Sequence, residues 1–458
     1  MFDAELLSRL QFAFTASFHF IFPPFSIGVG LLLVIFESCY LITKKKIYEK
    51  ITRFWIKIFA ANFSLGVATG IVLEFEFGTN WASYSRFVGD VFGSPLAAEG
   101  IFAFFLESGF LAILLFGWNR VRPAVHLFST IMVFTGSVLS GMWIIAANSW
   151  MHTPTGYEIV GVGDQARAQI TDFWAMVFNP SFAIRYLHTI VGSFIQGAFL
   201  VLSVSAYYLI RNKHLEFAKK SFTAALLVAA VCSVSQAFIG HESAKVTAKY
   251  QPAKLAAFEG VYLTLPETPL YVFGWTDEEK QITKGLAIPG GLSFLTHGDF
   301  NTPVTGLDRI PREDWPPVNK VFQSYHLMIS IGVFLIFLTL TGTFLFFRKK
   351  LFDKKWLLMV FTGSVFLPII ANQAGWFTTE VGRQPWIVQG LMRTSQGISK
   401  SVKPEEIMIS LVLFAIIYSL LLFSWLYVLN KEIQHGPESP DDQSEMQYGK
   451  MKNFADHI

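Results

Sequence analysis

The 458-residue chain has few cysteines and few charged residues. Its two cysteines, Cys39 and Cys232, both lie inside apolar segments, so neither a disulfide framework nor a cysteine-ligated metal site is expected. Charged residues make up only 15% of the chain, and the formal net charge is +3. This balance argues neither for nor against nucleic-acid binding, and we expect no nucleic-acid partner.

Two sequence features that would indicate other classes of protein are also absent. The N-terminus has no basic segment followed by a small-residue cleavage site, so no cleavable signal peptide is expected. No segment recurs at a fixed period, which weakens the case for a transporter built from inverted repeats.

Apolar residues dominate what is present. Hydrophobic residues make up 52% of the chain and aromatic residues 16%, and the mean hydropathy is +0.45. This content exceeds what a soluble domain of this length must bury, so it predicts an integral membrane protein. The 47 phenylalanines supply lipid-facing and helix-packing bulk, or else they line large flat cofactors.

Long apolar runs predict an all-α protein with nine transmembrane helices. Each run can cross about 30 Å of hydrocarbon, and together they cover residues 13–42, 54–76, 96–117, 124–147, 186–210, 220–239, 324–347, 356–376 and 407–429. We therefore divide the chain into six helices at 1–239, a loop at 240–323, three helices at 324–430 and a flexible polar tail at 431–458.

Cations in the connections orient these helices. The loop after the first run carries Lys44, Lys45, Lys46, Lys50, Arg53 and Lys57, and the third, fifth and seventh loops are also basic. Cytoplasmic loops are enriched in lysine and arginine. We therefore expect the N-terminus outside and the C-terminus in the cytoplasm, and the number of spans then places the 240–323 loop outside as well.

Six polar or soft-ligand side chains should share one layer near the outer face. They are His19, Glu74, Glu99, His188, Met328 and Glu380. Imidazole and thioether are axial ligands of low-spin haem, and an imidazole or carboxylate can hold a five-coordinate haem. Taken singly, each has a simpler role: histidine as an interfacial hydrogen-bonding group, methionine in packing, and glutamate reaching water.

Glu107 lies deeper in the same predicted helix as Glu99. The two are eight residues apart, so both can face one interior path about 12 Å long. A carboxyl group at mid-membrane is either neutral and hydrogen-bonded or part of a proton relay, and we favour the relay. Ser140 and Asn148 can extend the path, or they are simply polar residues in helix packing.

Five blocks in one order give the chain a resemblance to a known family. The blocks are GIVLEFEFGTNW at 70–81, AEGIFAFFLES at 98–108, GMWIIAANSWMHTP at 141–154, QPAKLAAFEG at 251–260 and GWFTTEVGRQPW at 375–386. They resemble subunit I of the cytochrome bd-type quinol oxidases, with a short quinol loop. The resemblance implies a terminal oxidase that oxidises membrane quinol, reduces dioxygen to water and builds a proton motive force without pumping.

The resemblance also implies cofactors and partners. His188 and Met328 would ligate a low-spin haem b. His19 and Glu380 would each ligate one of two high-spin haems, a second haem b and a haem d, which haem b can replace. A second multi-helix subunit would complete a heterodimer, and small single-helix accessory subunits would be possible.

Further roles follow from the same blocks. Lys254 and Glu259 would act in quinol oxidation, and Glu107 and Ser140 would belong to a proton path from the cytoplasm to Glu99, beside the His19 haem. Further cofactor contacts would come from Arg383, Trp376, Gln384 and Glu74.

The sequence departs from the family just before Met328, where SYHLMIS places His326 at the position of a frequent arginine. His326 is therefore a rival ligand. Two other functions fit the same intramembrane glutamates and histidines: an ion or solute transporter, and a haem-carrying quinone-binding anchor subunit without oxygen chemistry.

Overall fold

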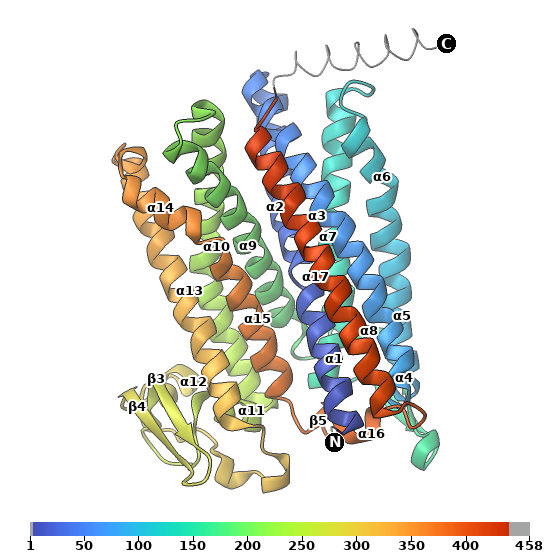
Figure 1. Ribbon diagram of the computed structural model, residues 1–458. Helices are drawn as coiled ribbons and strands as arrows, with labels where there is room; N and C mark the ends of the chain where they lie inside the picture. Colours follow the sequence, from blue (N-terminus) through green and yellow to red (C-terminus); the bar gives the residue numbers. More distant parts are fainter. Residues whose placement is uncertain (1–2, 439–458) are drawn as a thin grey trace.

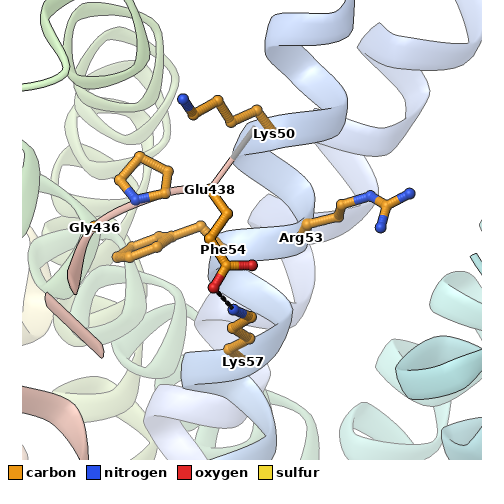
Figure 2. Close-up of a pocket in the computed structure, with 7 residues that line it drawn as sticks. Lys50, Arg53, Phe54, Lys57, Gly436 and Glu438 are labelled. Carbon is orange, nitrogen blue, oxygen red and sulfur yellow. Dashed lines mark hydrogen bonds and ion pairs between the residues drawn. The ribbon is translucent and has the colours of Figure 1, made fainter. Parts of the chain in front are cut away.

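A computed structural model describes residues 3–438 as a bundle of long helices (Figure 1). Among these residues, nine spans are long and apolar enough to cross a membrane, which confirms the predicted all-α membrane architecture. The first span begins at the end of the bundle opposite to the end where the last span finishes. Which end faces the cytoplasm stays a prediction.

The nine spans contain twelve labelled helices. In chain order they are α1 (Ala4–His19) with α2 (Phe22–Thr43), α3 (Lys46–Thr79), α5 (Gly89–Glu99) with α6 (Phe105–Phe116), α7 (Pro123–His152), α9 (Phe182–Ile210), α10 (Leu215–Tyr250), α13 (Val318–Phe347), α14 (Lys355–Gly363) with α15 (Phe366–Val381), and α17 (Pro404–His435).

Three of these spans are interrupted where the sequence analysis predicts continuous helices. Pro23 and Pro24 lack the N–H that an inner helical turn needs, so the first span breaks between α1 and α2, directly after His19. In a continuous helix the ring of Pro368 would clash with the carbonyl of Ser364, so the eighth span breaks between α14 and α15. A π-helical turn at Gly100–Phe104 joins α5 to α6, immediately after Glu99.

Several helices run beyond their predicted ends, and two of them, α10 and α17, change the predicted division of the chain. α10 continues to Tyr250 rather than ending near 239, because HESAKVTAKY is rich in helix-forming alanine, lysine and glutamate. The loop between the sixth and seventh spans therefore covers 251–317 instead of 240–323. α17 continues to His435, so the predicted tail starts later than 431, and its residues 439–458 lie outside the described residues.

α9 forms the centre of the bundle. In the most apolar window of this span 83% of the residues are buried, whereas the corresponding value is 17% for α5–α6 and 11% for α17. α9 packs against α10, α2, α7 and α14. A Cβ atom on Gly28 of α2 would lie 2.7 Å from Gly197 Cα of α9, so the pair of glycines permits this close crossing.

The remaining elements gather at the end of the bundle where α1 begins (Figure 1). The short helices are α4 (Ala82–Phe87), α8 (Phe173–Val177), α11 (Pro252–Glu259), α12 (Gly291–His297) and α16 (Thr394–Gly397). Three antiparallel pairs of strands accompany them: β1 (Tyr157–Val160) with β2 (Arg167–Ile170), β3 (Leu270–Asp277) with β4 (Ile282–Ile288), and β5 (Trp386–Val388) with β6 (Met392–Arg393).

Candidate functional site

Glu380, near the end of α15, is the centre of a polar network. Asn148 Nδ2 on α7 donates a hydrogen bond of 3.1 Å to Glu380 Oε1, and Arg383 Nη2 donates to Glu380 Oε2. Arg185 Nη2 on α9 donates in turn to Asn148 Oδ1. Two guanidinium groups therefore stand beside one carboxylate, which compensates charges that would otherwise be costly in this environment.

His152, the last residue of α7, connects this carboxylate to α11. Its Nε2 lies 3.4 Å from Glu380 Oε1, and its Nδ1 lies 2.8 Å from Lys254 Nζ. Lys254 also donates to Gln251 Oε1 at 2.9 Å. The sequence analysis does not single out His152 or Gln251. The one available signal is that His152 follows Asn148 by four residues and so shares its face of α7.

Lys254 and Glu259 lie on the same short helix and are both buried. Burial lowers the pKa of the Lys254 ammonium group well below its usual value, and the charges of Arg185 and Arg383 lower it further. Burial raises the pKa of the Glu259 carboxyl group to about 7, and an interaction with the Tyr325 side chain on α13 partly opposes this shift. α11 therefore carries a carboxyl group that can exchange a proton near neutral pH, together with a buried lysine whose ammonium form is destabilised.

Three of the four predicted iron ligands face a glycine on a neighbouring helix. A Cβ atom on Gly70 of α3 would lie 3.2 Å from His19 Cε1, and one on Gly240 of α10 would lie 3.6 Å from His188 Cε1. A Cβ atom on Gly375 of α15 would lie 2.9 Å from Met328 Sδ, closer than ordinary contact.

A larger residue at any of these three glycines would therefore press on the candidate ligand side chain.

Buried donors without partners also fit a haem. Among the described residues, His188 Nδ1, Arg185 Nε, and Arg383 Nε and Nη1 are buried with no hydrogen-bond partner. Guanidinium groups pair with carboxylates, and the propionates of a haem are carboxylates. The donor set of imidazole, thioether, carboxylate and two arginines therefore fits haem ligation and propionate binding.

The carboxyl groups of Glu99 and Glu107 both hydrogen-bond to α7. Ser140 Oγ donates to Glu99 Oε1 at 2.6 Å, and Ser137 Oγ donates to Glu107 Oε1 at 2.5 Å. The two serines are three residues apart, or about 4.5 Å along the helix, so the two carboxyl groups converge on one turn of α7. Ser137 is absent from the sequence-based set, although it precedes Ser140 by one turn.

Two residues predicted to contact a cofactor have other surroundings in the structure. His326 has Nδ1 2.8 Å from Phe322 O and Nε2 2.9 Å from Tyr271 O, so its ring is engaged by backbone carbonyls near β3. Glu74 is exposed, near enough to Glu99 for electrostatic repulsion. The buried glutamate of the same block is Glu76, which accepts a hydrogen bond from Thr15 Oγ1 at 2.7 Å.

Trp376 and Gln384 lie on either side of Glu380 in the chain. The Trp376 ring packs edge-on against Phe20, just after His19, with centroids 5.2 Å apart. Gln384 Nε2 donates to the Glu380 carbonyl at 3.3 Å and its Oε1 accepts from Thr394. The two residues thus help to hold the segment that carries Glu380 and Arg383.

Comparisons with known proteins identify the family of the chain. The family model for cytochrome bd terminal oxidase subunit I matches residues 7–437. The chain is 37% identical over 444 residues to cytochrome bd ubiquinol oxidase subunit 1 of Bacillus subtilis (strain 168), covering 94% of each chain. It is 34% identical to cytochrome bd-II ubiquinol oxidase subunit 1 of Escherichia coli (strain K12), covering 98% of this chain and 99% of the relative.

A solved structure is similar over the same length. The bd oxidase from Geobacillus thermodenitrificans has 33% sequence identity and a TM-score of 0.88, and the match covers 95% of this chain and 99% of that one. None of these matches supports the alternative of an ion or solute transporter. The chain belongs to the cytochrome bd terminal oxidase subunit I family.

Proposed function

We propose that this chain is the haem-bearing subunit of an oxidase in a bacterial cytoplasmic membrane that oxidises quinol and reduces dioxygen to water. The observation that carries the proposal is the connected polar chain from Lys254 through His152 to Glu380, with Arg185 and Arg383 beside it. It joins Lys254, on the short helix that also carries Glu259, to a candidate iron ligand on α15.

The quinol headgroup binds at α11. Lys254 and Glu259 are both buried, and the pKa of the Glu259 carboxyl group of about 7 makes it a suitable acceptor for a proton from a quinol hydroxyl group. Lys254, whose pKa is lowered by burial, hydrogen-bonds to the second hydroxyl group or carbonyl oxygen of the ring.

His188 and Met328 hold a low-spin haem b, and His19 and Glu380 each hold one high-spin haem, of type b or d. When bound, the haems supply one-electron transfer and, at a five-coordinate iron, dioxygen binding. Arg185 and Arg383 hold propionates with their remaining donors. Asn148, His152 and Arg383 fix the orientation of the Glu380 carboxylate.

Glu107 and Glu99 carry protons toward the haem layer with Ser137 and Ser140. The hydrogen bonds of 2.5 Å and 2.6 Å hold the two carboxyl groups against one turn of α7, where successive proton transfers need only short side-chain movements. Electrons from quinol oxidised outside then meet protons drawn from the cytoplasm. Each elementary charge separated in this way stores about 2.3 kcal/mol per 100 mV.

A second, multi-helix subunit completes the oxidase, because the relatives are each subunit 1 of an oxidase. The weakly buried spans α5–α6 and α17 offer apolar faces for that subunit and for lipid. We further expect that small single-helix subunits can join the complex.

Absorption spectra of the purified complex, recorded after dithionite reduction with and without carbon monoxide, test the proposal. We expect haem bands and a carbon monoxide difference spectrum. The His188→Ala variant should lose the low-spin bands selectively, whereas His297→Ala, at an exposed histidine of α12, should not. A colourless complex would refute the proposal, and haem that binds no carbon monoxide would indicate an anchor subunit instead.

A further inference from the structure

The β3–β4 hairpin exposes an apolar face at the end of the bundle. Phe273 and Trp275 on β3 are each 62% exposed, and Leu286 and Ile288 on β4 are also exposed. The register pairs Phe273 with Leu286 and Trp275 with Lys284, so these side chains share one side of the hairpin. Large apolar side chains gathered on one face indicate an interaction surface.

The inner side of the hairpin is attached to the first three turns of α13. His326 Nε2 lies 2.9 Å from Tyr271 O, and Gln323 Nε2 donates to Gly274 O at 2.9 Å. Further from the membrane-spanning part of α13, Thr276 Oγ1 donates to Asn319 Oδ1 at 3.2 Å. β3 therefore runs antiparallel to α13, with its first residues toward the bundle and its last residues away from it (Figure 1).

Composition changes along the hairpin in the same direction. The turn that points away from the bundle is the charged sequence Asp277–Lys280, and the base contains Leu270 and Ile288. Trp275 lies between them, opposite Lys284. An apolar base, a tryptophan with a lysine at intermediate height and a charged tip match the polarity profile of a membrane interface.

Exposed apolar side chains also lie on the elements that adjoin the hairpin. Leu327 of α13, one residue after the His326 contact with β3, is exposed, as is Phe334 further along the same span. On the other flank, Phe294 of α12 and Phe300 are exposed and stacked, with centroids 4.8 Å apart. The apolar face of the hairpin thus stands beside a candidate membrane span that itself exposes apolar side chains.

We propose that this face of the β3–β4 hairpin lies in the lipid headgroup region and anchors the α11–α13 segment to the membrane surface. The occupant is lipid of the leaflet at this end of the bundle. Thr283 Oγ1 of β4 donates to Gly260 O at 2.6 Å, directly after Glu259. The position of the hairpin in the leaflet therefore also sets the position of the α11 end that carries Glu259.

Site-directed spin labelling of the complete oxidase tests this proposal. Cys39 and Cys232 are replaced by alanine, and single labels are introduced by Phe273→Cys, Leu286→Cys and, as a matched control at the tip, Lys280→Cys. The complexes are placed in vesicles of phosphatidylethanolamine and phosphatidylglycerol without quinol. Accessibility to dioxygen, which partitions into lipid, is compared with accessibility to a water-soluble nickel chelate.

The ratio of dioxygen accessibility to nickel accessibility should be several-fold higher for the labels at 273 and 286 than for the label at 280. Nickel accessibility at 273 and 286 equal to that at 280 would overturn the proposal, because the face would then lie in water. Protection from both reagents would also overturn it, because another protein surface would cover the face. The haem spectrum identifies misfolded variants, and Ile288→Cys replaces any label position that misfolds.

Discussion

Gly136→Ala should slow turnover by displacing Glu107. Gly136 lies on α7 next to Ser137, and a Cβ atom built on it would lie 2.4 Å from Glu107 Cγ and 3.2 Å from the Ala103 carbonyl oxygen. The first separation is about 1 Å short of ordinary van der Waals contact. Because the carbonyl belongs to the backbone, the Glu107 side chain has to move.

The displacement breaks the hydrogen bond that holds Glu107. A movement of about 1 Å takes the carboxyl group out of reach of the Ser137 hydroxyl group, now 2.5 Å away. A typical hydrogen bond contributes about 0.5–1.5 kcal/mol and overpacking costs about 1–3 kcal/mol. If these effects raise the activation free energy of proton delivery by about 1.4 kcal/mol, turnover decreases about tenfold.

The assay measures quinol-driven oxygen consumption and the haem spectrum of the same preparation. The matched control is Gly109→Ala, two residues from Glu107 on α6, where an added Cβ atom meets nothing within 4 Å. We expect slow turnover with full haem content for Gly136→Ala and normal turnover for the control. Equal turnover in both variants would refute the role of Glu107 in proton delivery.

Three further predictions concern the haem ligands and the quinol site. In Gly375→Ala, the new Cβ atom would lie 2.9 Å from Met328 Sδ and displace it. This substitution should abolish the low-spin haem b bands while the high-spin bands persist, and unchanged spectra would contradict ligation by Met328. His152→Ala should shift the spectrum of the haem held by Glu380, and His152→Gln, whose amide can donate to Glu380, should restore it; identical spectra in both would contradict this orienting role. Burial raises the pKa of Glu259 to about 7, so its carboxyl group is protonated below that pH and ionised above it. Quinol oxidation should therefore increase as the pH rises through about 7, and Glu259→Gln should remove this increase; a pH profile unaffected by the substitution would show that Glu259 is not the acceptor.

The sequence alone predicted the membrane architecture. A segment of about 20 apolar residues satisfies its own backbone hydrogen bonds only as a helix in lipid, so hydropathy identifies each span without reference to its neighbours. Because hydropathy considers only the apolar run, it also explains why some helix boundaries were predicted wrongly. Helix formers such as Ala244 and Lys245 extend α10 past the apolar run, and prolines interrupt α1–α2 and α14–α15 inside theirs.

The candidate histidine and glutamate ligands could also be predicted from sequence, because an ionisable residue in an apolar run is costly and therefore conspicuous. Met328 is itself apolar, and its role as a ligand is implied by the family resemblance. The residues that contact these candidate ligands could not be predicted from sequence. His152 meets Glu380 across 228 residues and Lys254 across 102, and Gly240 and Gly375 gain meaning only opposite His188 and Met328. Such pairings arise from helix packing, which depends on the shapes of whole surfaces and leaves no local signal. The tertiary structure therefore decided which polar groups form one network and which glycine lies opposite each candidate ligand.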